Sequence, residues 1–232
     1  MIITFSGVDC AGKSTQIELL RQYFISQGKS VTVFWYRPGY SKELQKTKDL
    51  IRFGIQKGQN LKKRWTDSAL TNTNNEKNPN PSDSEQKTSR PQIPVSLWLT
   101  TALLDTAAQW ALKLRLLTRQ YDVVICDRYV EDARLDLLMK SPEYFWPEAV
   151  LKKLAAFFPK PDRSILLWLP FDEMLRRVAE KNEPFPDDER TRQMRYRAYE
   201  FAADDDEYIL NDSSGPKEET HRKILQAITN KK

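Results

Sequence analysis

Residues 1–15 read MIITFSGVDCAGKST, an apolar run followed directly by two glycines, a lysine and two hydroxyl residues. Residues 2–5 are too continuously apolar or β-branched for a half-exposed segment, so they predict a buried strand. The pattern over residues 15–27, which closes on Gly28, predicts a helix. Gly7, Gly12 and Lys13 therefore occupy a loop between the end of a strand and the start of a helix.

The spacing of these residues matches the phosphate-binding P-loop pattern G-x-x-x-x-G-K-[ST]. The glycines allow positive φ and a close approach of phosphate to the backbone, and the helix N-terminus favours an anion. Lys13 would reach the β- and γ-phosphates, and the Ser14 hydroxyl would coordinate Mg²⁺. The alternative is a glycine turn that only opens a helix. The pattern predicts bound ATP and Mg²⁺, with a binding loop formed by Gly7, Val8, Asp9, Cys10, Ala11, Gly12, Lys13, Ser14 and Thr15.

The rest of the chain alternates between apolar runs and helical patterns. Further buried parallel strands are predicted at residues 31–35, 123–126, 165–169 and 208–210. Helices are predicted at residues 15–27, 95–119, 147–158, 171–181, 187–203 and 217–229. Strand and helix in repeated alternation indicate a doubly wound α/β sheet, and the length suits one domain over residues 1–232.

Residues 59–94 depart from this alternation, because they are rich in Asn, Ser, Lys and Pro and contain few apolar residues. We expect a mobile insertion there, and a substrate lid or a partner-binding arm is the alternative. The net charge of +5 would suit nucleic acid, an anionic surface or a phosphorylated small molecule. No basic arm, zinc spacing or RNA signature is present, so nucleic acid is not expected as a partner. Without an apolar run of spanning length or a secretion signal, we expect no membrane association and a cytoplasmic location.

A second polar motif follows the run at residues 123–126, in the stretch VVICDRY. A carboxylate at the carboxyl end of a buried strand points into the crevice where open α/β sheets bind ligands. Asp127 could there hold Mg²⁺ opposite Ser14. Arg128 would project toward the phosphoryl acceptor, because a guanidinium fits a phosphate monoester. The alternative is an Asp-Arg turn with a surface ion pair.

Five segments in order resemble the thymidylate kinase family of nucleoside monophosphate kinases. They are GVDCAGKSTQ (7–16), YRPG (36–39), DRY (127–129), PD (161–162) and RYRAYEFAADDDEYILND (195–212). The resemblance implies a three-layer P-loop kinase fold, in which a five-stranded parallel sheet carries helices on both faces. It also implies a mobile lid and transfer of the ATP γ-phosphate to a nucleoside monophosphate such as thymidylate. A homodimer is a possible assembly.

The resemblance also implies roles for individual residues. Asp9 matches an acid that the family places near the acceptor, and Arg128 matches the arginine that binds the acceptor phosphate. With Lys13 they form the expected catalytic set. Lys48 stands near a further phosphate-binding position. The lid is expected at residues 176–192, and one of its cations must cover the transferring phosphoryl group. The expected lid cations are Arg176, Arg177 and Lys181, and the expected acceptor-binding residues are Arg37, Lys48, Thr106, Arg128 and Asp132.

Several departures from the family fall in the acceptor half of the site. The family's REPGG is YRPGY here (36–40), and Thr106 stands where the family has a phosphate-gripping arginine. Cys10 takes a loop position at which some members carry a catalytic arginine. Asp132 and Asp136 fall where the family lines its base pocket, so thymine should lose its advantage over an amino-bearing base such as cytosine. Alternatively, both carboxylates lie i and i+4 on one helix face and point to solvent.

Three functions remain open on these grounds. The first is a nucleoside monophosphate kinase, and the second is a P-loop kinase of another small anionic acceptor. The third is a nucleotide-binding switch protein with weak or no phosphoryl transfer.

Overall fold

The computed structural model describes residues 1–41, 94–140, 142–181, 188–203 and 207–229. Lys48, the expected insertion up to residue 93 and lid residues 182–187 lie outside these ranges. Five parallel strands form one sheet in the order β2-β3-β1-β4-β5. The strands are β1 (Ile2–Gly7), β2 (Val31–Trp35), β3 (Val123–Asp127), β4 (Arg163–Trp168) and β5 (Ile209–Asp212).

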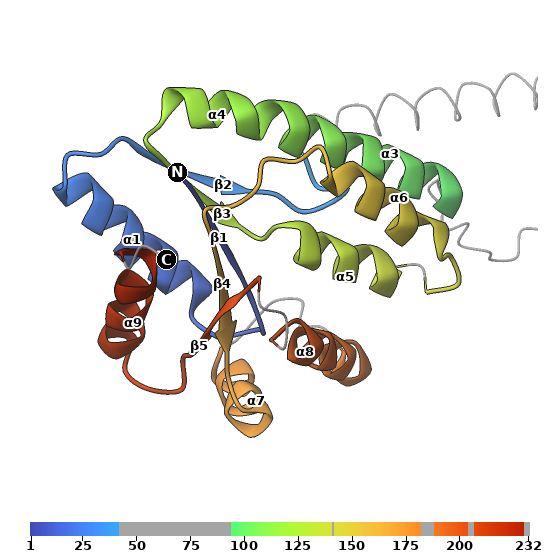
Figure 1. Ribbon diagram of the computed structural model, residues 1–232. Coiled ribbons are helices and arrows are strands. Elements are labelled where there is room, and N and C mark those ends of the chain that lie inside the picture. Colours follow the sequence, from blue (N-terminus) through green and yellow to red (C-terminus); the bar gives the residue numbers. More distant parts are fainter. Residues whose placement is uncertain (42–93, 141, 182–187, 204–206, 230–232) are drawn as a thin grey trace, which may run out of the picture.

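The helices cover both faces of this sheet (Figure 1). On one face, α1 (Lys13–Ser26) packs against α9 (Lys217–Thr229). The other face carries α3 (Val95–Ala107), a π-helix η1 (Ala108–Lys113), α4 (Leu114–Gln120), α5 (Val130–Lys140) and α6 (Trp146–Ala155). Within the described residues, α7 (Phe171–Glu180) and α8 (Glu189–Ala203) lie toward the end of the sheet where the strands terminate. The expected α/β fold with a five-stranded parallel sheet is confirmed.

The register of the central strands brings the two predicted motifs together. β1 is buried along its whole length and lies between β3 and β4. Phe5 of β1 is paired with Asp127 of β3, and Gly7 is paired with Leu167 of β4. The loop after β1 and the residues after β3 therefore leave the sheet side by side at its carboxyl edge.

Two of the strands predicted as buried lie at the edges of the sheet. β2 exposes 39% of Val33 and 52% of Trp35, and β5 exposes 48% of Leu210. The prediction of buried strands was wrong for these two, because an edge strand has a neighbour on one side only. A run of apolar residues does not show whether its strand lies at the edge or in the centre of a sheet.

The long helix predicted at residues 95–119 is interrupted in the structure by η1. A π-helical turn accommodates an extra residue and changes the direction of the side chains that follow it. Trp110 of η1 is fully buried. Its ring packs against Tyr36, Tyr129 and Phe158, with centroid distances of 5.2, 4.9 and 5.3 Å. These aromatic contacts join the long helix to β2, to the start of α5 and to the loop after α6.

Helix α5 was not among the helices predicted from the hydrophobic pattern, although one alternative placed Asp132 and Asp136 on a helix face. Its apolar residues Val130, Ala133 and Leu137 follow the spacing of one helical face and pack on the core beneath α3.

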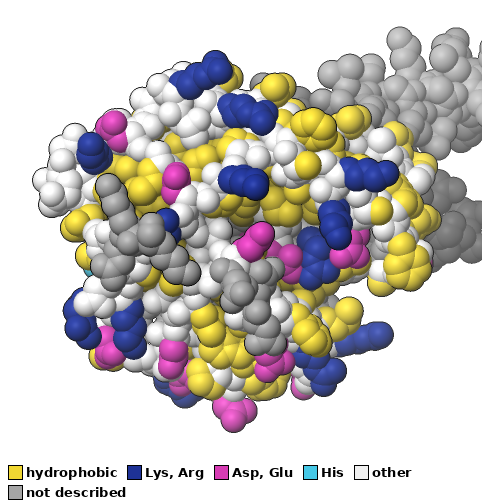
Figure 2. Space-filling view, in the orientation of Figure 1, with side chains coloured by type: hydrophobic (Ala, Val, Ile, Leu, Met, Phe, Trp, Pro, Cys, Tyr) yellow, Lys and Arg dark blue, Asp and Glu magenta, His cyan; other side chains and the backbone are white. Residues whose placement is uncertain are grey.

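The layer containing α3, η1 and α4 also exposes Leu104 and Leu112, and Figure 2 shows hydrophobic side chains among the basic ones on that surface. No helix in the described part of the chain is long and apolar enough to cross a membrane.

Candidate active site

The P-loop follows β1 and has the backbone geometry that its glycines permit. Gly7 has φ 140°, and a Cβ placed on it would lie 2.1 Å from the backbone oxygen of Leu167 in β4. Gly12 precedes α1 with φ 82°, and Cys10 also has positive φ, at 57°. Glycine at position 7 is therefore required by both conformation and close packing.

Lys13 lies in the first turn of α1 and folds back over the loop. Its Nζ donates to the carbonyl oxygens of Gly7 (2.7 Å) and Val8 (2.8 Å). Burial lowers the pKa of this amine below its usual value, and the nearby Arg128 charge lowers it further. Ser14 and Thr15 are exposed beside it. The amine is thus held by two neutral acceptors that phosphate oxygens can replace.

A cavity of about 610 Å³ opens at the carboxyl edge of the sheet. Its walls come from the P-loop, from the ends of β2 and β3, and from α7 and α8. Among the described residues that line it, seven are basic and two, Asp9 and Asp127, are acidic. The basic ones are Lys13, Arg37, Arg128, Arg177, Lys181, Arg192 and Arg195. This excess of positive charge fits a ligand that carries several phosphates.

Asp127 ends β3 next to the P-loop, and it lines the cavity together with Ser14. Burial raises the pKa of this carboxyl group, while the charges of Lys13 and Arg128 oppose the increase. The described residues contain no cluster of three or more His, Cys, Asp or Glu side chains that could hold a metal ion by themselves. Mg²⁺ prefers one or two protein ligands together with substrate phosphates and waters. The pair Ser14 and Asp127 fits an Mg²⁺ ion that arrives with a nucleotide.

Arg128 also lines the cavity, and its backbone has an unusual conformation. Its φ is 82°, and its N–H donates to the carbonyl oxygen of Phe5 at 3.0 Å. Left-handed backbone is disfavoured for a side chain with a Cβ, so the hydrogen bond to β1 holds the turn. Helix α5 begins two residues after this turn.

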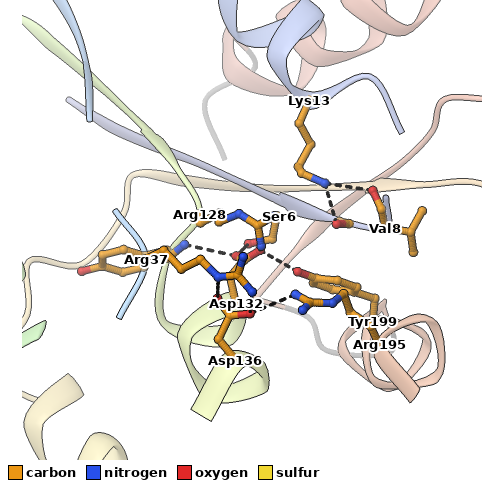
Figure 3. A network of polar contacts seen from close by, with 11 residues as sticks. Ser6, Val8, Lys13, Arg37, Arg128, Asp132, Asp136, Arg195 and Tyr199 are labelled. Carbon is orange, nitrogen blue, oxygen red and sulfur yellow. Dashed lines mark hydrogen bonds and ion pairs between the residues drawn. The ribbon is translucent and has the colours of Figure 1, made fainter. Parts of the chain in front are cut away.

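Asp132 lies behind this turn and does not line the cavity. The residue is 1% exposed. It accepts hydrogen bonds from Ser6 Oγ (2.5 Å), from the backbone N–H of Tyr129 (3.1 Å) and from the Tyr199 hydroxyl (2.6 Å). A nitrogen of Arg128 is 3.7 Å away. Asp132 therefore ties β1, the Arg128 turn and α8 together (Figure 3).

Replacing Asp132 with asparagine should lower the free energy of unfolding by about 1 to 3 kcal/mol, because the amide cannot accept from every donor around it. Urea denaturation followed by circular dichroism measures the loss. Glu131→Gln, on the same helix but partly exposed, is the control and should cost less than about 1 kcal/mol. Equal losses in the two variants would contradict a special role for Asp132.

Asp136, one turn further along α5, also faces the protein interior. Arg37 donates to its two oxygens from Nε (2.7 Å) and Nη2 (2.8 Å). Arg195 of α8 donates to Oδ1 at 3.0 Å. Since Asp132 and Asp136 are 1% and 8% exposed, the alternative that both point to solvent was wrong. Their oxygens are instead engaged by protein donors.

Thr106 is fully buried and lies outside the cavity lining. Its hydroxyl donates to the carbonyl oxygen of Ala102 (2.7 Å) and is 2.9 Å from the Tyr36 hydroxyl. The neighbouring Asp105 accepts from Tyr36 at 3.2 Å and from Ser41 at 2.7 Å. Thr106 therefore helps to fix the YRPG turn to α3.

The expected lid cations divide into two groups. Arg177 and Lys181 line the cavity, whereas Arg176 does not. Arg176 is exposed and forms ion pairs with Glu173 (2.8 Å) and Glu180 (2.6 Å) on its own helix. Arg177 also pairs with Glu173, at 2.7 Å.

Outside the predicted binding loop and lid, two described lining residues were missed in the sequence, namely Trp35 and Arg195. Arg195 is 5% exposed and belongs to the inward face of α8 with Tyr196 and Tyr199. An arginine on the otherwise apolar and aromatic stripe of a helix is a signal that could have identified it, since buried arginines are rare without a partner. Trp35 gave no signal, because it reads as one more apolar residue of β2.

Compared with known protein families, residues 99–224 match the model of the family described as thymidylate kinase. The match covers more than half of the chain. It begins within α3 and ends within α9, so it includes Asp127, Arg128 and helices α7 and α8. The P-loop precedes the matched segment.

Proposed function

Because the chain belongs to the thymidylate kinase family, we propose that it transfers the γ-phosphate of ATP to a nucleoside monophosphate. Family membership supports a nucleotide kinase activity in general. The observation that carries the finer proposal is one cavity in which a P-loop lysine and the arginine after β3 face the same space. Such a cavity can hold a triphosphate donor and a phosphorylated acceptor together.

In the proposed reaction an oxygen of the acceptor phosphate attacks the γ-phosphorus of ATP. The bond from that phosphorus to the β,γ-bridging oxygen breaks, and ADP leaves with the electron pair. Lys13 would stabilise the charge that develops on the β- and γ-phosphate oxygens. Arg128 would hold the acceptor phosphate, and Asp9 would lie near the acceptor. Arg177, Lys181 and Arg192 also line the cavity, and they would be the cations that cover the group in transfer.

Mg²⁺, when bound with the nucleotide, neutralises phosphate charge. Ser14 and Asp127 would be its protein ligands. Burial raises the pKa of Asp127 in the absence of the metal, and a bound cation would favour the carboxylate form.

An ADP-release assay with ATP, Mg²⁺ and a panel of acceptors tests this proposal. The panel contains thymidylate, uridylate, cytidylate, the purine monophosphates and the deoxy forms. Release of ADP that depends on one of these acceptors supports the proposal. ADP release with none of them favours the alternatives, a kinase of another small anionic acceptor or a nucleotide-binding switch. The homodimer, the cytoplasmic location and the absence of nucleic-acid binding remain predictions.

Asp127→Asn should raise the Mg²⁺ concentration needed for half-maximal activity about tenfold, because a neutral amide is a weaker ligand for a hard cation. Binding of the nucleotide should change less, since the backbone of the P-loop still surrounds the phosphates. Magnesium titrations of the two proteins at fixed ATP measure the effect. Superimposable curves would mean that Asp127 is not a metal ligand.

A further inference from the structure

One buried ring contacts the sequence neighbours of two arginines of the cavity. Tyr36 directly precedes Arg37, and Tyr129 directly follows Arg128. Both arginines line the cavity. The rings of Tyr36 and Tyr129 pack on Trp110, at centroid distances of 5.2 and 4.9 Å. Trp110 itself is fully buried and does not line the cavity.

The two tyrosines are also fixed through their hydroxyl groups. The Tyr36 hydroxyl is 2.9 Å from that of Thr106, and the Tyr129 hydroxyl donates to the carbonyl oxygen of Pro159 at 2.6 Å. Each tyrosine is thus held at one end by its hydroxyl and along its ring by Trp110. Because protein interiors are close-packed, a change in the volume of the shared ring should displace both turns.

The identity of residue 110 is not explained by stability alone. The Nε1 atom of Trp110 is buried without a hydrogen-bond partner among the described residues. A buried donor without an acceptor is costly, and phenylalanine would avoid that cost. Phenylalanine would, however, present a smaller ring to the two tyrosines. The size of the indole ring therefore accounts better for a tryptophan in η1.

The two halves of the cavity rest on different cores. Tyr36, Trp110 and Tyr129 belong to the buried cluster on the face of the sheet that carries α3. Val8 and Ala11 of the P-loop belong to the cluster on the opposite face, with α1. A change in the Trp110 cluster should therefore reach the turns of Arg37 and Arg128 and leave the P-loop in place.

We propose that Trp110 is a positioning residue that sets the separation of Arg37 and Arg128, and through it the affinity for the phosphoryl acceptor. Trp110 contacts neither substrate and acts through the two tyrosines. The donor nucleotide, held by the P-loop over the other core, is not affected. This inference rests on the proposed function, because it takes the side of the cavity with Arg128 as the acceptor half.

The test measures equilibrium binding of both substrates by calorimetry. One probe is a non-hydrolysable ATP analogue with Mg²⁺. The others are thymidylate, uridylate, cytidylate and the purine monophosphates, each measured with that analogue at saturation. Trp110→Phe is the main variant, since it keeps an aromatic ring and removes the unpaired N–H. Urea denaturation confirms that each variant is folded.

Leu151→Ala is the matched control. Leu151 is 1% exposed and lies in the same core cluster as Trp110, but its helix, α6, supplies none of the described residues that line the cavity. The variant should lower the midpoint of urea denaturation. Its affinities for both probes should stay within about twofold of the native values, as for independent sites.

Trp110→Phe should weaken the tightest monophosphate by about threefold to tenfold, the effect of losing one aromatic pair. Its affinity for the ATP analogue should change less than about twofold. If Trp110→Phe does not fold, Tyr129→Phe keeps the ring and removes the hydroxyl contact with Pro159. The same selective loss is then expected.

Equal losses for the two probes, no loss for the monophosphate, or a selective monophosphate loss in Leu151→Ala would overturn the inference. So would a native protein that binds none of the monophosphates. Selective losses without ADP release by the native protein would support the role of Trp110 and contradict the proposed transfer. ADP release together with native monophosphate binding by Trp110→Phe would do the reverse, so the two proposals can fail separately.

Discussion

Lys13→Ala is expected to lower kcat by about 10² to 10³, the effect of removing one preorganised donor from developing charge. Within the described residues, the Lys13 amine donates hydrogen bonds to the carbonyl oxygens of Gly7 and Val8, and both of these lie in its own loop. These carbonyls can be hydrated when the side chain is removed, so the free energy of unfolding should change by less than about 1 kcal/mol. Steady-state kinetics with the best acceptor and urea denaturation give the two quantities.

Lys29→Ala is the matched control, since Lys29 is exposed beyond the other end of α1. Its kcat should equal that of the native protein. If Lys13→Ala retained native turnover, the assignment of the P-loop as the triphosphate site would be wrong. A large loss of stability in the same variant would indicate that the lysine acts through packing.

Gly7→Ala should destabilise the folded protein by about 4 kcal/mol or more, or prevent folding, because two separate costs combine. The residue has φ 140°, a conformation open almost only to glycine. The added methyl group would also lie 2.1 Å from the Leu167 oxygen in the central strand β4. That oxygen cannot move without disturbing the pairing of β1 with β4.

Gly28→Ala separates these costs. Gly28 also has positive φ, at 73°, but a Cβ there would meet nothing within 4 Å. Only the backbone cost remains, so the loss should be about 1 to 2 kcal/mol. Urea denaturation of both variants measures the difference. Similar losses would show that β1 and β4 can separate to admit the methyl group.

The fold could be predicted because its signals are local. Each strand is predicted by a short apolar run, and the P-loop would bind its ligand through residues that are adjacent in sequence. The predicted strands therefore fall within three residues of the observed ones at every boundary. The family match then supports the same fold independently.

The acceptor half of the cavity could not be predicted in the same way, because its contacts join distant segments. Asp136 meets Arg37 and Arg195, which are 99 and 59 residues away in sequence. The sequence led us to expect Asp136 in the base pocket. It does not show that this carboxylate is held between two arginines. The π-helical turn around Trp110 is also set by packing, against Tyr36, Tyr129 and Phe158. Such features depend on tertiary structure.

The left-handed backbone of Arg128 lowers the stability of the folded protein at the same position that supplies a cation to the cavity. Left-handed conformation costs a residue with a side chain about 1 to 2 kcal/mol, and glycine avoids that cost. Selection for melting temperature alone would thus favour glycine at position 128, and the cavity would lose a cation. Engineering of a heat-resistant form should therefore leave this turn unchanged and look for its gains elsewhere, for example on the exposed surface of the α3 layer.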